Sequence, residues 1–195
     1  MKMAKKFLAV ALAGVLALSL LTGCGNSVKS KDIADSLNKM GVKVELSKEV
    51  DETAEKTLKA IETIIAADSA NKITLDNAVE KVTGKVISQE HIDVNTDAAN
   101  AVQKALGVFA NGNDAEKANA GKQVRVALVE IKNAEKDASL QAAFVKDALV
   151  QAQAGDTTDN KQPVEPGKLG TATTKDGKYM LVVIVNDVVA KTANN

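Results

Sequence analysis

The sequence predicts an α+β domain in which helices pack around a small, mainly antiparallel sheet, and three observations support this prediction. Segment 48–68 has the apolar spacing of an amphipathic helix. The dipeptide Asp176-Gly177, typical of a tight hairpin turn, separates two strand-like segments. The run 179–185 is apolar at every position, which indicates a strand buried on both faces. We therefore expect helices on both faces of the sheet, with the C-terminal hairpin supplying its central strand.

The elements of the first half follow from local spacing. Ile33 and Leu37 lie one helical turn apart in segment 32–39, which predicts a helix, and alternation over 42–46 predicts a first strand. Ser47 is the candidate N-cap of the long helix over 48–68. The elements expected next are a shorter helix over 74–83, a possible edge strand over 85–89, and a helix that begins at Thr96 and is ended by residues 111–113.

The second half contains one ambiguous segment. Residues 124–131 combine β-branched alternation with helix-favouring flanks, and we favour a strand over a helix there. A helix is expected from about residue 133 until Gly155. Segment 156–167 holds both prolines and has no apolar period, which predicts a loop, and 168–174 and 178–187 form the two arms of the hairpin.

The first 25 residues have the layout of an export signal. A basic start precedes an apolar run over 7–21, and these 15 residues are fewer than the roughly 20 that a membrane-spanning helix needs. Residues 21–24 (Leu-Thr-Gly-Cys) resemble the lipobox of bacterial lipoproteins, in which a diacylglyceryl group is attached to the Cys and a peptidase cuts before it. The resemblance implies a type II signal peptide and a lipidated Cys24, and two acyl chains give lasting attachment. An ordinary signal peptide with a chance Cys is the alternative.

This resemblance divides the chain into a lipoprotein signal peptide (1–23), a lipidated tether (24–31) and a single extracytoplasmic α+β domain (32–195). Cleavage of 23 residues from 195 leaves 172, enough for one domain with a true core. We expect the mature protein to be held on the extracytoplasmic face of the cell membrane through the diacylglyceryl group on Cys24. Whether the bacterium has one membrane or two is left open.

Composition narrows the classes of function. Cleavage removes three Lys from 25 basic residues and leaves 22 against 25 acidic ones, so no nucleic-acid partner is expected. The only Cys is the predicted lipid-attachment site, so no thiolate nucleophile, disulfide or zinc site is expected. We expect no cofactor.

The single histidine is the one candidate catalytic residue that the sequence offers. His91 lies near Ser88 and Asp93, residue types that a hydrolytic triad uses. No G-x-S-x-G motif accompanies them, and we favour a surface histidine. A transition-metal site needs several His or Cys ligands, so none is expected.

Three other segments are interpreted structurally. The oxygen-rich residues 155–160 lack the spacing and the closing Glu of an EF-hand, which favours a solvated linker. Residues 167–171 precede a strand, whereas a phosphate-binding loop follows one, so glycines 167, 170 and 177 are assigned to turns. The acidic residues of segment 49–55 are assigned to the solvated face of a helix.

Residues 169–183 resemble the closing hairpin of the cysteine-rich secretory/pathogenesis-related (CAP) domain family, and the order of helices, strand and hairpin is similar. The resemblance implies an exported α-β-α sandwich. The metal-site pattern of that family has no counterpart here beyond His91, so no family residue is carried over, and 112–155 would be an insertion.

These observations predict a lipid-anchored envelope protein that acts as a non-enzymatic binding or interaction module for an unknown envelope protein or small ligand. The alternatives are a divergent CAP-like protein and a hydrolase directed at cell-wall or peptide substrates. Such a hydrolase would use His91 as its base, or paired carboxylates that only the fold brings together.

Overall fold

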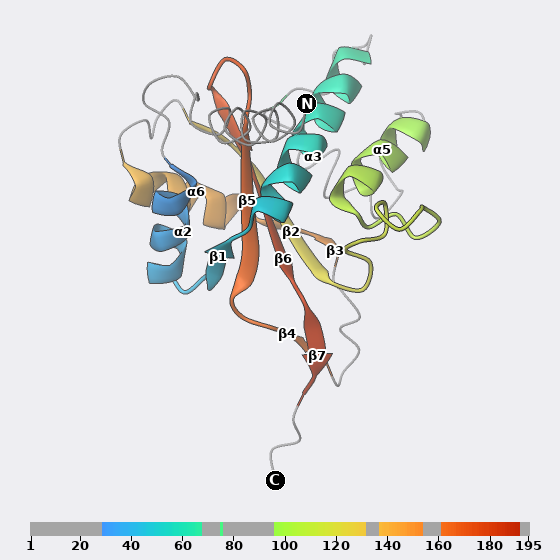
Figure 1. The fold of residues 1–195 in the computed structure, drawn as a ribbon. Helices are drawn as coiled ribbons and strands as arrows, with labels where there is room; N and C mark the ends of the chain where they lie inside the picture. The colour runs from blue at the N-terminus through green and yellow to red at the C-terminus, as the bar shows by residue number, and fades with distance from the viewer. Residues whose placement is uncertain (1–28, 68–74, 76–95, 132–136, 154–160, 192–195) are drawn as a thin grey trace, which may run out of the picture.

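A computed structural model describes residues 29–67, 75, 96–131, 137–153 and 161–191, which form an α+β fold as the sequence predicts (Figure 1). No helix in these ranges is long and apolar enough to cross a membrane. The elements are, in order, α2 (Ser30–Lys39), β1 (Val44–Leu46), α3 (Lys48–Ala67), α5 (Thr96–Leu106), β2 (Gln123–Glu130), α6 (Ala138–Ala148), β3 (Val150–Gln153), β4 (Lys161–Pro163), β5 (Gly167–Thr173), β6 (Tyr179–Asn186) and β7 (Val188–Ala190).

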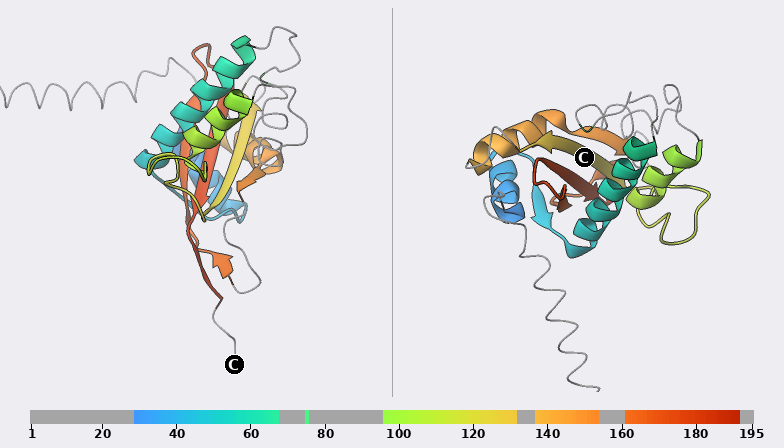
Figure 2. Two further views of the ribbon diagram at one scale, coloured as in Figure 1. Left: turned by 90° about the vertical axis from the view of Figure 1, so that its right-hand side faces the viewer. Right: turned by 90° about the horizontal axis from the view of Figure 1, so that it is seen from above.

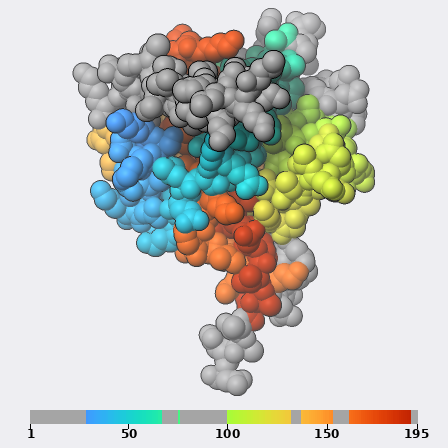
Figure 3. Space-filling model, viewed as in Figure 1, coloured from blue at the N-terminus to red at the C-terminus, as the bar shows by residue number. Residues whose placement is uncertain are grey.

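The main sheet has five strands in the order β1-β5-β6-β2-β3. Only the β1–β5 pair is parallel, and the other three pairs are antiparallel. Strand β6 is central and pairs with β2 and β5 along nearly its whole length, which confirms the position predicted for the apolar run over 179–185. A second sheet consists of β4 and β7 alone and extends beyond the end of β6 (Figures 1 and 3).

Helices cover both faces of the main sheet (Figure 2). On β6, the odd-numbered residues from Leu181 to Val185 belong to a core under α3 and α5. The even-numbered residues from Met180 to Ile184 belong to a second core under α2 and α6. Because neighbouring side chains on a strand point to opposite faces, an uninterrupted apolar run supplies both cores at once.

Helix α3 packs closely against β5, and Gly170 makes this approach possible. A Cβ atom at Gly170 would lie 2.1 Å from the carbonyl carbon of Val50 in the first turn of α3. Gly167 also lies in β5, against the side chain of Asn186. The assignment of these two glycines to turns is therefore wrong, because backbone approach rather than turn geometry requires them. Gly177 does lie in the hairpin turn, with a φ of 70°.

The region after residue 123 contains the main differences from the predicted elements. Strand β2 confirms the preference for a strand over 124–131. The prediction of one helix until Gly155 is wrong, because α6 ends at Ala148 and the chain then turns into β3. Strand β3 pairs with the edge of β2, and such pairing can override a local helical preference.

Smaller differences occur at the ends of elements. Helix α2 begins at Ser30, inside the segment assigned to the tether, and α5 ends at Leu106, earlier than predicted. The side chain of Asn119 donates to the carbonyl of Leu106 at 2.8 Å, which helps to end α5 there. Part of the predicted loop over 156–167 forms β4, which pairs with β7. The predicted elements over 74–83 and 85–89 lie outside the described residues, apart from helical Leu75.

Candidate functional site

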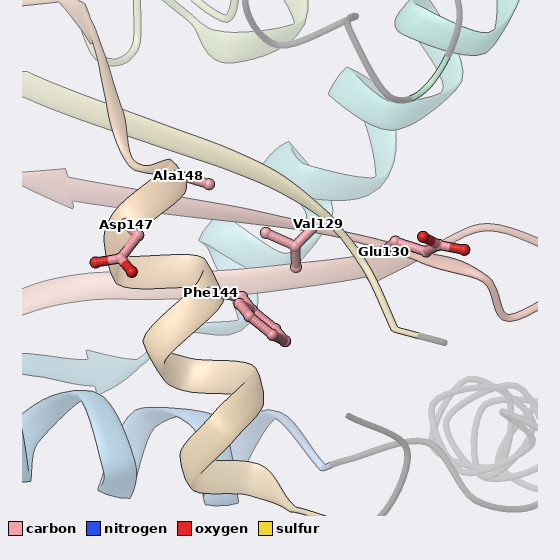
Figure 4. A pocket seen from close by; sticks show the side chains of 5 residues that line it. All are labelled: Val129, Glu130, Phe144, Asp147 and Ala148. Carbon is pink, nitrogen blue, oxygen red and sulfur yellow. The ribbon is translucent and has the colours of Figure 1, made fainter. Parts of the chain in front are cut away.

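A groove of about 450 Å³ lies between α6 and the far end of β2. Its apolar lining consists of Val129, Phe144 and Ala148, and two carboxylates, Glu130 and Asp147, complete it. Figure 4 shows the Phe144 ring beside Val129, with Asp147 and Glu130 at opposite ends. The groove therefore offers an apolar surface bordered by negative charge.

Helix α6 exposes apolar side chains as well as burying them. Ala142 and Val145 are fully buried in the core under α2 and α6. Leu140 and Phe144 are 42% and 39% exposed, and their spacing of four places them on one side of the helix. Isolated exposed apolar residues are common, but two neighbours beside a groove make this surface a candidate site.

The two carboxylates of the groove are available to a ligand. Neither Glu130 nor Asp147 makes a salt bridge or a side-chain hydrogen bond within the described part of the chain. Their side chains point away from one another in Figure 4. This arrangement suits the binding of two separate cationic groups. Two carboxylates that act as an acid–base pair would instead point toward one another and share a proton.

The backbone of β2 is open beside the groove. Strand β3 pairs with β2 only as far as Val126. The amide of Ile131 donates to the carbonyl of Lys178 at 2.7 Å, on the β6 side of the strand. Because backbone groups alternate in direction along a strand, those of Leu128 and Glu130 point to the opposite edge. Among the described residues, no strand pairs with this part of the edge.

A buried amide lies on α6 next to the groove. Gln141 is fully buried, and neither its Oε1 nor its Nε2 atom has a hydrogen-bond partner among the described residues. It precedes Phe144 by three residues and is therefore its neighbour on the helix surface. A buried polar group without a partner costs about 1–3 kcal/mol, so α6 carries a stability cost where it borders the groove.

A second polar cluster protects the edge of β5. The Asp51 carboxylate, in the first turn of α3, accepts a 2.8 Å hydrogen bond from the amide of Thr171, and the Thr171 and Ser30 hydroxyls lie 2.6 Å apart. Burial raises the pKa of Asp51, although the bond from Thr171 acts in the opposite direction. Asp51 therefore differs from the solvated acids predicted for this helix, because it covers an edge that β1 leaves open.

The only arginine of the chain lies at the opposite end of β2 from the groove. Arg125 donates from Nη2 to Oδ1 of Asn186 at 3.2 Å, and Asn186 donates to the carbonyl of Val164 at 2.8 Å. Burial lowers the pKa of Arg125, and its buried Nε atom has no hydrogen-bond partner in the described ranges. These contacts link β2, β6 and the segment before β5.

The structure places few of the residues singled out by sequence. Cys24, His91 with its neighbours Ser88 and Asp93, and segment 155–160 lie outside the described residues. Segment 167–171 forms part of β5. In the part of the chain that the structure describes, no three His, Cys, Asp or Glu side chains are grouped to hold a metal ion.

Sequence reasoning missed the groove. It predicted one helix from about residue 133 until Gly155, which holds Leu140, Phe144 and Ala148, and it assigned no site to that helix. The apolar residues of α6 in fact cover more than one helical stripe, since Ala142 and Val145 already fill the core side. That excess was the available signal, but its meeting with Val129 depends on the fold.

No protein-family model matches the chain, and no curated protein or solved structure is significantly similar to it. Segment 112–155, which the CAP resemblance leaves without a counterpart, contains β2, α6 and β3, and with them every residue of the groove. The groove is therefore interpreted from its own chemistry.

Proposed function

We propose that the chain is a lipid-anchored protein on the extracytoplasmic face of a bacterial membrane, and that its domain is a non-enzymatic binding module for an envelope protein or small ligand. The α6–β2 groove is the binding site in this proposal. The export signal and the lipobox-like segment that ends at Cys24 support the anchor. One observation carries the binding role: Phe144 is exposed in a groove between two carboxylates that have no partner within the described residues.

The binding role is tested by site-specific photo-crosslinking in cells that produce the full chain. A photoreactive phenylalanine analogue replaces Phe144, and the matched control carries it at Val189 of β7, which is 46% exposed and distant from the groove residues in sequence. We expect a discrete, saturable crosslink from position 144 and none from position 189. Equal labelling from both positions, or none from 144, contradicts the proposed site.

The anchor is tested separately with Cys24→Ser. The wild-type protein should incorporate labelled palmitate, whereas the variant should not, because the sulfur that carries the lipid is absent. Incorporation of labelled palmitate by Cys24→Ser, or none by the wild type, would contradict the proposed anchor and leave the groove proposal unaffected.

A hydrolase is the alternative, since two acids line the groove. The two carboxylates point away from one another, which favours binding over acid–base chemistry (Figure 4). Incubation of the full chain with peptidoglycan fragments separates the two functions. Hydrolysis that Glu130→Gln and Asp147→Asn both abolish would overturn the non-enzymatic proposal.

A further inference from the structure

Building on the binding site proposed above, we propose that the groove takes an extended polypeptide segment of alternating apolar and basic residues, which adds to the sheet as a strand beside β2. This inference names the chemistry of the partner, and it rests on three observations about the described residues: an open strand edge, different side chains on the two faces of that strand, and unpaired negative charge.

The open edge provides the backbone contacts. Leu128 and Glu130 each present one amide and one carbonyl group to the side of β2 that β3 leaves uncovered. An extended segment that pairs there can make up to about four backbone hydrogen bonds, enough to hold roughly four residues. Unpaired strand edges of this kind are natural sites of strand addition.

The two faces of the sheet determine the pattern of side chains. Val129 belongs to the core on the α6 side, whereas Leu128 packs against the core on the opposite side. Glu130 shares the face of Leu128 because it lies two residues further along the strand. The side chains of an added strand alternate in the same way. Every second one therefore meets the face with Val129 and Phe144, and the others meet the face with Glu130.

The charge of the groove selects the partner. Glu130 and Asp147 have no cation partner among the described residues. The lysine or arginine side chains of the added strand lie on the face of Glu130 and can pair with it, whereas Asp147 on α6 adds negative charge that attracts a basic segment to the groove. An acidic segment would be repelled. A second copy of this chain, pairing through the same edge, would bring the carboxylates of both copies together, so a heterologous basic segment fits better.

The test is a titration of the full chain, purified in detergent, with the blocked peptide Val-Lys-Val-Lys-Val-Lys. Three peptides are controls. The first has the same composition with its three Val and three Lys in separate blocks, the second alternates Val and Glu, and the third is the alternating basic peptide N-methylated at alternate amides. The alternating basic peptide should bind, and each control should bind at least about tenfold more weakly, because each removes the pattern, the charge or the hydrogen bonds.

Protein variants locate the binding. Phe144→Ala and the double variant Glu130→Gln/Asp147→Asn should each weaken binding by about tenfold, the size expected for a central contact, while Val189→Ala should leave it unchanged. Equal binding of the N-methylated and unmodified peptides would overturn strand addition. Equal binding of the acidic peptide would overturn the charge assignment.

Failure of this inference can be distinguished from failure of the binding role itself. If no peptide binds but position 144 still gives a discrete crosslink in cells, the groove remains the binding site and the strand-like basic partner is rejected. If position 144 gives no crosslink and no peptide binds, both proposals are rejected.

Discussion

Replacement of Gln141 by methionine should stabilise the protein. The Gln141 side chain is fully buried, and neither polar atom of its amide has a hydrogen-bond partner in the part of the chain that the structure describes. Methionine has nearly the same length and shape, so the substitution removes the two polar atoms without leaving a large cavity. An unsatisfied buried group costs about 1–3 kcal/mol, so the free energy of unfolding should rise by about that amount.

The assay is urea denaturation of the full chain followed by far-UV circular dichroism, since the sequence contains no Trp for fluorescence. The transition midpoint should rise while its slope stays constant, and the melting temperature should rise by about 2–4 °C per kcal/mol. The control is Gln151→Met, because Gln151 is an exposed glutamine on β3, where the same change should alter stability by less than about 0.5 kcal/mol.

A Gln141→Met variant whose free energy of unfolding is lower than that of the wild type by about 1 kcal/mol or more would refute this reasoning. That result would mean that the Gln141 amide makes hydrogen bonds in the folded protein, with a buried water for example, and that those bonds outweigh its desolvation.

Three further substitutions test other contacts by the same denaturation assay. Gly170→Ala places a Cβ atom 2.1 Å from the carbonyl carbon of Val50, and should cost about 1–3 kcal/mol or more. Asp137→Ala removes the N-cap of α6, which accepts from the amides of Ser139 and Leu140, and should cost about 0.5–2 kcal/mol. Burial raises the pKa of Asp51 above 3.8, so the folded state binds the proton more tightly, and stability should fall as pH rises from 3.8 through the folded pKa. Asp51→Asn keeps an acceptor for the amide of Thr171 and should lose this pH dependence.

Each of these predictions has a clear contrary outcome. Wild-type stability of Gly170→Ala would mean that α3 does not need close contact with β5. An unchanged Asp137→Ala variant would mean that other groups satisfy the first turn of α6. If Asp51→Asn keeps the pH dependence between 3.8 and neutrality, another group causes it.

The elements that sequence predicted correctly are those with strong local signals. Helix α3 follows from apolar residues spaced three and four apart, and its buried residues Val50, Leu58 and Ile61 lie on that stripe. The central strand follows from an apolar run that only a doubly covered strand can bury, and the turn before it follows from Asp176-Gly177. The lipid anchor at Cys24 also rests on a contiguous segment of the sequence, and it stays a prediction.

Other features depend on residues that are far apart in the sequence. Asp51 differs from its solvated neighbours because it meets Thr171, 120 residues away. The segment after Ala148 becomes a strand because the edge of β2 is available for pairing.

By itself, the sequence determined the class of fold and the central strand, because both are encoded in the spacing of neighbouring residues. The export signal and the lipid attachment at Cys24 stay predictions from the sequence. Only the tertiary structure decided where the candidate site lies. Val129 and Phe144 form one groove because α6 packs beside the end of β2, and its two carboxylates stay unpaired because the fold brings no cation to them within the described residues.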